Sequence, residues 1–338
     1  MSNAAAVLDR LRPASSLTVV CHDDPDPDSL ASAIALESLA RAQGVETVDI
    51  LYGGTIVHQQ NRAFVELFDV TPQRYSDTKL EANELVAFVD HSVPGDHNPV
   101  PPGTTIDVVI DHHPSEGSIP ADVVDVRESY GATATILAEY FRESSVEVTS
   151  RIASALLFGI HRERLDFYRQ PTDREYAVAG YLHERADPRR LRELYGVSFL
   201  PDSVDAFGDV IHNRIRRGSS LASCIGRLEN RVALAQGADF LLNIDGVDTV
   251  LVCGLVRDEI HLSGRTNRSD LDLGESFIRL FGDRGNVGGH DDMAGGQLPL
   301  ADVAGTAEEE AVLVDRVRDR IGREFLEAVS DDATGSSA

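Results

Sequence analysis

The sequence has no tryptophan, only three cysteines, a single lysine among its 31 basic residues, and no apolar run long enough to span a membrane. Cys21, Cys224 and Cys253 are odd in number and widely spaced. This spacing argues against a disulfide framework and against a cysteine zinc site. The first residues contain no apolar signal core. We therefore expect a cytoplasmic protein in a reducing compartment, without a membrane partner.

The charge balance is strongly acidic, with 56 aspartates and glutamates and a formal net charge of -25. Repulsion on this scale is screened only at high ionic strength. An acidic, nearly lysine-free chain is typical of a salt-rich cytoplasm, so we predict a halophilic, archaeal source. The same charge argues against binding duplex nucleic acid through a basic face. It still allows a small phosphate ligand, because a metal ion and a few arginines can outweigh the local field.

Apolar runs alternate with helical periodicity along the first half of the chain. Runs at 17–20, 85–89 and 106–110 are rich in Val, Ile and Leu, which is typical of strands buried on both faces of a parallel sheet. The alternation predicts an α/β fold with a doubly wound, mostly parallel sheet. A smaller C-terminal α/β domain with a glycine-rich segment follows a charged, helical connector.

These patterns place four segments along the chain. We predict a metal-binding catalytic domain over 15–187, a helical linker over 188–220 and a substrate-binding domain over 221–330. The small polar residues 331–338 are expected to be disordered.

Three clusters of acidic and histidine residues each follow one of these predicted strands. They are, in order, Cys21-His22-Asp23-Asp24-Pro25-Asp26-Pro27-Asp28, then Asp90-His91, then Asp111-His112-His113. The carboxyl ends of parallel strands meet at one edge of a sheet, where ligands bind. Taken alone, Asp28 suits a helix N-cap as well as a metal. Adjacent ionisable groups at a buried strand end, such as Asp111 and His112, need partners.

Carboxylates mixed with imidazoles suit Mn²⁺ or a similar divalent ion, and the thiolates of structural zinc are missing. Two ions about 3.5–4 Å apart, bridged by one carboxylate, can clamp a phosphate and activate water. Taken together, the three clusters favour a metal site over isolated caps and turns.

The pattern of these clusters resembles the first three motifs of the DHH phosphoesterase superfamily. The matching residues are His22-x-x-x-Asp26-x-Asp28, Val89-Asp90-His91 and Asp111-His112-His113. That superfamily includes RecJ-like exonucleases, nano-RNases, cyclic-dinucleotide phosphodiesterases and family II pyrophosphatases. The resemblance extends through Tyr130–Thr135 and covers roughly residues 15 to 187.

The resemblance implies a site for two Mn²⁺ ions, with Mg²⁺ or Co²⁺ as alternatives. Its metal ligands would be His22, Asp26, Asp28, Asp90, His112 and Glu163. His22 and Asp26 would hold one ion, Asp28 and His112 the other, and Asp90 would bridge them. His113 would contact the scissile phosphate or protonate the leaving oxygen, and Asp111 would orient its neighbours.

One ligand departs from the family pattern. The fourth motif usually reads Gly-Ile-x-Thr-Asp-Thr, whereas this chain places Glu163 at the aspartate position, between Arg162 and Arg164. Glu163 either ligates the second ion or pairs with one of these arginines, and Asp166, although out of phase, is a second candidate ligand. In the first case the longer side chain is expected to weaken or alter the site.

The second half resembles the C-terminal substrate domain of the same family. Ser263-Gly264-Arg265-Thr266 and Gly288-Gly289-His290 are similar to its Ser-x-Arg-Ser strand end and glycine-rich loop. Arg265 can fork onto phosphate oxygens, and Gly288 and Gly289 allow close backbone approach. The resemblance therefore assigns Arg265, Gly288, Gly289 and His290 to substrate binding.

The leading hypothesis is a metal-dependent phosphodiesterase that cleaves short single-stranded oligonucleotides or dinucleotides to nucleoside monophosphates. Cyclic dinucleotides and 3′-phosphoadenosine 5′-phosphate suit the same site. A RecJ-like exonuclease is less favoured, because no arginine and aromatic stripe stands out in the sequence. A pyrophosphatase shares the first-domain motifs, and a nucleotide sensor would accommodate the Glu163 departure. A homodimer is expected from the family resemblance.

Overall fold

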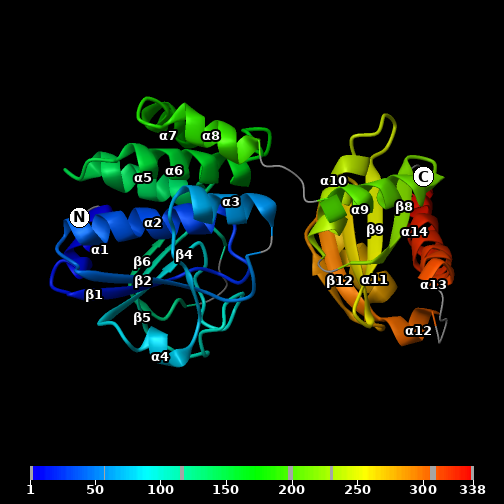
Figure 1. The fold of residues 1–338 in the computed structure, drawn as a ribbon, viewed down its shortest axis with the longest axis horizontal. Coiled ribbons are helices and arrows are strands. Elements are labelled where there is room, and N and C mark those ends of the chain that lie inside the picture. Colours follow the sequence, from blue (N-terminus) through cyan, green and yellow to red (C-terminus); the bar gives the residue numbers. More distant parts are fainter. Residues whose placement is uncertain are drawn as a thin grey trace. The chain divides into compact units, whose positions relative to one another are not determined.

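The computed structural model describes residues 3–56, 58–114, 118–196, 201–228, 231–304 and 310–335. They divide into two compact units, residues 1–198 and 199–338 (Figure 1). In the part of the chain described, no helix combines the length and the apolar composition that crossing a bilayer requires.

The N-terminal unit is built on a six-stranded sheet in the order β3-β2-β1-β4-β5-β6. Every strand pair in it is parallel, which confirms the predicted parallel sheet. The strands are β1 (Ser16–Val20), β2 (Thr47–Tyr52), β3 (Gln73–Arg74), β4 (Leu85–Val89), β5 (Ile106–Asp111) and β6 (Ala121–Val126). The chain leaves β1 toward β2 and returns to β4 on the other side, so the switch point of the topology lies between β1 and β4.

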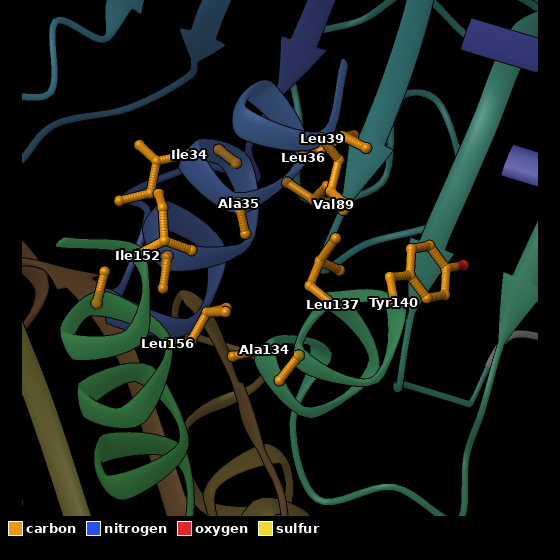
Figure 2. Close-up of a cluster of buried hydrophobic side chains, with 14 of the residues drawn as sticks. Ile34, Ala35, Leu36, Leu39, Val89, Ala134, Leu137, Tyr140, Ile152 and Leu156 are labelled. Atoms are coloured by element: carbon orange, nitrogen blue, oxygen red, sulfur yellow. The ribbon is translucent and has the colours of Figure 1, made fainter. Parts of the chain in front are cut away.

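The helices of this unit form layers beside the sheet. They are α1 (Asn3–Leu11), α2 (Pro27–Ala42), α3 (Gln59–Leu67), α4 (Asp77–Leu80), α5 (Thr133–Glu143), α6 (Ser150–Glu163), α7 (Asp173–His183) and α8 (Pro188–Tyr195). Figure 1 shows α2, α5 and α6 on one side of the sheet, with α7 and α8 farther out. Between them lies an apolar cluster in which Ile34 and Leu39 meet Val89, Leu137 and Ile152 (Figure 2).

Local sequence explains where α2 begins. Asp26 accepts hydrogen bonds from the backbone N–H groups of Asp28 and Ser29, and Pro27 occupies the first helical position. Both features favour a helix start. The helix therefore begins at the residues that the first acidic cluster contains, and Asp26 rather than Asp28 is its N-cap.

The C-terminal unit contains a six-stranded mixed sheet in the order β11-β12-β10-β9-β8-β7. Within it only β8 and β9 pair in parallel. The elements are α9 (Pro201–His212), β7 (Ile215–Arg217), β8 (Ser220–Arg227), α10 (Val232–Leu241), β9 (Thr249–Val256), β10 (Glu259–Thr266), α11 (Leu273–Phe281), β11 (Asn286–Gly289), β12 (Met293–Pro299), α12 (Leu300–Ala304), α13 (Glu310–Val317), a π-helical turn (Arg318–Gly322) and α14 (Arg323–Gly335).

Two expectations about the connections differ from the structure. The segment 188–220 is not a separate connector: α8 packs on α3 and α6 of the first unit, whereas α9 packs on β8 and α10 of the second, and β7 joins the second sheet. The expected disordered tail is helical as far as Gly335, because α14 continues through these residues. Residues 336–338 of that tail lie outside the described residues.

Candidate metal centre

Three neighbouring strands end at the candidate site. β1, β4 and β5 are adjacent in the sheet and lead into His22, Asp90 and His112 respectively. The site therefore lies at the switch point, where open α/β sheets bind ligands. The structure brings the three sequence clusters to one edge, as predicted.

Asp90 is the centre of this arrangement. Its Oδ2 lies 3.4 Å from Nε2 of His22, and its Oδ1 lies 3.6 Å from Nε2 of His112. Thr133 donates a hydrogen bond from Oγ1 to Asp90 Oδ1 at 2.9 Å. The Asp90 backbone has a φ of 68°, a left-handed conformation that an aspartate adopts at some cost and that concentrates at functional sites. Each carboxylate oxygen thus faces a different imidazole.

Asp26 and Asp28 approach the centre from the start of α2. Asp26 Oδ1 lies 3.9 Å from His22 Nε2, so the N-cap carboxylate also faces the centre. Asp28 accepts hydrogen bonds from the backbone N–H groups of Thr133 and Ala134, both at 2.8 Å. These amides belong to the first turn of α5, whose own N-cap makes no side-chain cap. Asp28 therefore accepts hydrogen bonds at the positive N-terminal end of α5, although it lies itself in α2.

His112 is buried, and its two ring nitrogens have different environments. Nδ1 lies 3.3 Å from the carbonyl oxygen of Tyr130, which fixes this nitrogen as the N–H donor. Nε2 lies 3.9 Å from Asp28 Oδ2 and has no hydrogen-bond partner among the described residues. An imidazole held through one nitrogen and directing the other at carboxylates is the arrangement of a metal-ligating histidine.

Two carboxylates of the centre have a raised proton affinity, whereas the pKa of Asp26 is lowered because its hydrogen bond to His22 and the His22 charge, together with backbone N–H groups, outweigh burial. Burial, and then the charges of Asp90 and Asp26, raise the pKa of Asp28 well above its ordinary value. Burial followed by the charges of Asp26 and Asp90 raises the pKa of Glu163 to about 7. A divalent cation would neutralise this repulsion. Together with the unpartnered Nε2 of His112, the donor set fits a metal site.

Two groups of possible ligands overlap here. His22, Asp26 and Asp90 can supply atoms that lie within 4.8 Å of one another, and so can Asp90, His112 and His113. Asp90 is common to both groups. Two clusters sharing one carboxylate are what a bridged pair of ions requires.

His113 and Asp111 form a hydrogen-bonded pair beside the centre. Asp111 Oδ1 lies 2.9 Å from His113 Nδ1, and Ser92 donates to Asp111 Oδ2 at 2.5 Å. Burial opposes the charge on both residues, but their mutual hydrogen bond, the Ser92 hydrogen bond to Asp111 and the nearby carboxylate charges together outweigh it. The pKa of Asp111 falls to about 2, and that of His113 rises to about 9. His113 is half-exposed, and since Nδ1 is engaged by Asp111, Nε2 is the nitrogen left to meet a substrate.

Glu163 is the last residue of α6. It makes neither a hydrogen bond nor an ion pair with any described residue, although Asp26 and Asp90 are close enough to raise its pKa. Arg164, one of the two proposed partners, instead donates from Nε to the carbonyl oxygen of Gly131. Glu163 is therefore near the centre but outside both groups of possible ligands.

Three further residues support the centre and received no role from the sequence. Thr133 and Ser92 orient Asp90 and Asp111, as described above. His91 is buried against the ring of Phe88, with ring centroids 4.3 Å apart, and its Nε2 has no hydrogen-bond partner in the described part of the chain. Burial lowers its pKa to about 4. His91 adjoins Asp90 in sequence, which is the only signal that could have indicated it.

The expected substrate residues of the C-terminal unit are held by their own neighbours. Arg265 donates from Nε to Asp239 at 2.7 Å and from Nη1 to the Gly264 carbonyl at 2.8 Å. Gly288 and Gly289 lie in β11 of a hairpin rather than in a loop, which corrects the expectation. A Cβ at Gly289 would lie 2.3 Å from the Met293 carbonyl oxygen, so only glycine fits there. His290 is exposed at the hairpin turn.

The fold and the site define a two-domain α/β protein with a candidate metal centre at the edge of its parallel sheet. Residues 16–160 match the model of the DHH family, N-terminal domain, and residues 218–323 match the DHHA1 domain. The chain belongs to the DHH phosphoesterase superfamily, which confirms the resemblance read from its motifs.

Curated relatives extend over much of this chain. An uncharacterized protein of Methanocaldococcus jannaschii, MJ1633, is 33% identical over 314 residues, which is 93% of this chain and 64% of that protein. A probable manganese-dependent inorganic pyrophosphatase of Listeria monocytogenes serotype 4a is 29% identical over 187 residues, which is 54% of this chain and 59% of that protein. The chain thus spans about three fifths of the length of these relatives.

Solved structures share the fold at low sequence identity. An exopolyphosphatase-related protein from Bacteroides fragilis has a TM-score of 0.74 and 13% identity, over 96% of each chain. RecJ from Thermus thermophilus in complex with Mn²⁺ has a TM-score of 0.52 and 14% identity, over 95% of this chain and 54% of that one. At these identities the similarity concerns the fold alone.

Proposed function

We propose that this chain is a divalent-metal-dependent phosphodiesterase that hydrolyses short oligonucleotides or dinucleotides to nucleoside monophosphates. The observation that carries the proposal is Asp90, whose two oxygens face the imidazoles of His22 and His112 at 3.4 and 3.6 Å. A buried carboxylate between two imidazoles is suited to bridge two ions.

Within this proposal, we assign a set of ligands to each ion. His22, Asp26 and one oxygen of Asp90 would hold one ion. Asp28, His112 and the other oxygen of Asp90 would hold the second, with Glu163 as the remaining ligand after a change of its side-chain rotamer. Mixed imidazole and carboxylate donors favour Mn²⁺, with Mg²⁺ or Co²⁺ as alternatives. When bound, the ions would polarise the phosphoryl group and lower the pKa of a water molecule.

The neighbouring residues would orient groups and move a proton. Tyr130 holds His112 through Nδ1, so its other nitrogen stays directed at the carboxylates. Asp111 holds His113 through Nδ1 and stabilises its protonated form. His113 Nε2 would then donate the proton to the leaving oxygen of the phosphodiester, as a general acid. Asp111 acts through His113 and is a positioning residue.

The choice of a short substrate is supported by charge. A long single strand requires a positively charged groove that follows its backbone, whereas this chain has a net charge of -25. Arg265 and the hairpin containing Gly288, Gly289 and His290 fall within the DHHA1 match and would bind the nucleotide. The acidic composition supports a salt-rich archaeal cytoplasm as the setting, and a homodimer remains part of the proposal.

Pyrophosphate hydrolysis is the second candidate activity. The Listeria relative that aligns with 54% of this chain is named a probable manganese-dependent inorganic pyrophosphatase. The metal centre described above would suit either pyrophosphate or a phosphodiester. Only a comparison of the two hydrolysis rates can distinguish the two activities.

The deciding experiment is hydrolysis of the linear dinucleotide pApA with Mn²⁺ in molar-range KCl. We expect AMP to be released by the wild type and by Glu147→Gln, an exposed carboxylate away from the site, but not by His112→Ala. Parallel assays use pyrophosphate, a cyclic dinucleotide and a long single strand. Faster turnover of pyrophosphate than of pApA would replace the proposal by a pyrophosphatase. Nucleotide binding without any turnover by folded, Mn²⁺-loaded protein would make the chain a sensor.

A further inference from the structure

The exposed aromatic side chains of the N-terminal unit gather in one region. Among its described residues, Tyr168 is 91% exposed, Tyr176 55% and Leu165 43%. Tyr195 is also exposed, and the other large exposed apolar side chain of this unit, Val124, lies apart on β6. We call Leu165, Phe167, Tyr168 and Tyr176 the aromatic ledge.

The backbone of the ledge is strained. Leu165, Asp166 and Phe167 have φ values of 43°, 54° and 70°, and no glycine eases this turn. Three consecutive non-glycine residues in the left-handed region are costly and persist only where their surroundings hold them. Here the Asp166 N–H donates to the His161 carbonyl at 2.7 Å, and the Tyr195 hydroxyl donates to Asp166 Oδ1 at 2.5 Å.

Ring contacts give the ledge a defined surface. Phe167 stacks on Tyr176 with ring centroids 5.0 Å apart and an interplanar angle of 18°. His161 and Phe167 form an edge-to-face pair with ring centroids 4.9 Å apart. Phe167 therefore contacts two rings, and Tyr168, which follows it directly, donates its backbone N–H to the Leu165 carbonyl at 3.1 Å, so the exposed side chains belong to a turn with defined contacts.

The ledge adjoins the metal centre through the residues on either side of it. Arg164 donates to the carbonyl of Gly131, and Glu175 accepts from the N–H of Gly131 at 2.9 Å. Gly131 lies two residues before Thr133, whose backbone N–H holds Asp28 at 2.8 Å. The turn therefore begins directly after Glu163 and is fastened at both ends to the segment that anchors a metal-centre carboxylate.

We propose that the aromatic ledge stacks against a nucleobase of the nucleotide whose phosphate lies at the metal centre, with Tyr168 as the stacking side chain. This inference rests on the proposed function and adds a residue that determines its substrate class. Every base has a π-face, so stacking is tolerant of base identity. A neutral base is not repelled by this strongly acidic chain, whose formal net charge is -25.

The test compares two substrates across four proteins. The substrates are pApA and an analogue in which one adenine is replaced by an abasic site, both with Mn²⁺ at fixed KCl. The proteins are the wild type, Tyr168→Ala, Tyr168→Phe and the exposed control Val124→Ala. We expect Tyr168→Ala to raise KM for pApA about 10-fold while leaving kcat and the abasic analogue within about 2-fold. Tyr168→Phe should retain the wild-type KM.

A binding measurement separates this inference from the proposed function. A dinucleotide containing 2-aminopurine loses fluorescence when its base stacks on the ledge, and this readout needs no turnover. Quenching by the wild type that is lost in Tyr168→Ala would support the ledge even if hydrolysis is absent. Equal KM for wild type and Tyr168→Ala, equal loss on both substrates, or no quenching would overturn it. So would a change in oligomeric mass with unchanged nucleotide binding, since the ledge would then contact another copy.

Discussion

Two buried charged clusters of the N-terminal unit differ in how their charges are matched. In the first, Arg127 forms two 2.8 Å hydrogen bonds to the two oxygens of Asp125 and a third, also at 2.8 Å, to Glu139. Tyr140 also donates to Asp125, at 2.5 Å. In the second, the metal centre, buried carboxylates face one another. The pKa of Asp125 is lowered because its hydrogen bonds outweigh burial, whereas the pKa of Asp28 is raised.

The difference in charge pairing suits the Arg127 cluster to a structural role and the metal centre to a functional one. A fully paired buried network rigidifies the fold, and an incompletely paired one destabilises it unless a ligand completes it. The two clusters also meet at Tyr130. Its hydroxyl joins the Arg127 network by donating to Glu139 at 2.8 Å, while its carbonyl accepts from His112. The satisfied cluster thus positions a residue of the unsatisfied one.

The largest expected effect comes from Asp90→Asn. Loss of the shared carboxylate should reduce hydrolysis at least about 1,000-fold, or about 4 kcal/mol in activation free energy. The stability of the metal-free variant should change little, because relief of the repulsion on Asp28 and Glu163 offsets the lost attraction to His22. Steady-state kinetics and urea unfolding without metal measure the two effects.

Added Mn²⁺ provides the control for Asp90→Asn. It should raise the unfolding temperature of the wild type, since a ligand that binds only the folded state stabilises it. Asp90→Asn should show little of this increase. Strong destabilisation of the metal-free variant would mean that Asp90 is a structural residue.

The paired cluster should respond in the opposite way. Asp125→Asn removes the carboxylate that Arg127 contacts through two hydrogen bonds, leaves it the bond to Glu139, and should lower the free energy of unfolding by about 3 kcal/mol. Activity per folded molecule should stay within about 3-fold. Asp122→Asn, at an exposed position on the same strand, should change stability by no more than about 0.5 kcal/mol.

Acid provides a second test of Asp125. Its folded-state pKa is lowered, so its contribution is present above the unfolded-state pKa and is lost as pH falls through the folded-state pKa. Asp125→Asn should therefore reduce the acid dependence of unfolding, measured by circular dichroism. An unchanged dependence would contradict the pairing seen here.

Glu163 should make the metal-free protein less stable as pH rises, which is the reverse of the dependence expected from Asp125. Its folded-state pKa of about 7 lies above the ordinary 4.5, so the folded state binds the proton more tightly. Stability should fall by about 1–3 kcal/mol as pH rises from about 5 to about 8. Glu163→Gln should flatten this slope in metal-free urea unfolding. If the wild type and the variant lose stability equally with rising pH, Asp28 rather than Glu163 causes the pH dependence.

The smallest effect is expected in the C-terminal unit. Arg265→Ala should raise KM for pApA about 5-fold with kcat within about 2-fold, because it removes one phosphate contact. Arg217→Ala, an exposed arginine paired with Glu327 at 3.7 Å, is the matched control. If both variants have the same KM for pApA, Arg265 does not contact the substrate and only forms its ion pair with Asp239.

The sequence by itself determined the parallel sheet and the edge at which the site lies. Apolar runs indicate buried strands, and the polar residues that follow them indicate where these strands end. Because parallel strands end at one edge of the sheet, His22, Asp90 and His112 could be predicted to lie close together. The cap on α2 was equally local, because Asp26 and Pro27 adjoin the helix that they start.

Only the tertiary structure decided the contacts between distant segments. Asp28 is held by amides 105 and 106 residues away, Arg164 turns to Gly131 rather than to Glu163, and 188–220 is divided between two units. The aromatic ledge depends on a left-handed turn that contains no glycine. A periodic pattern reports which residues are buried, but the partner of a buried charge and the path of a strained turn depend on packing across the whole fold.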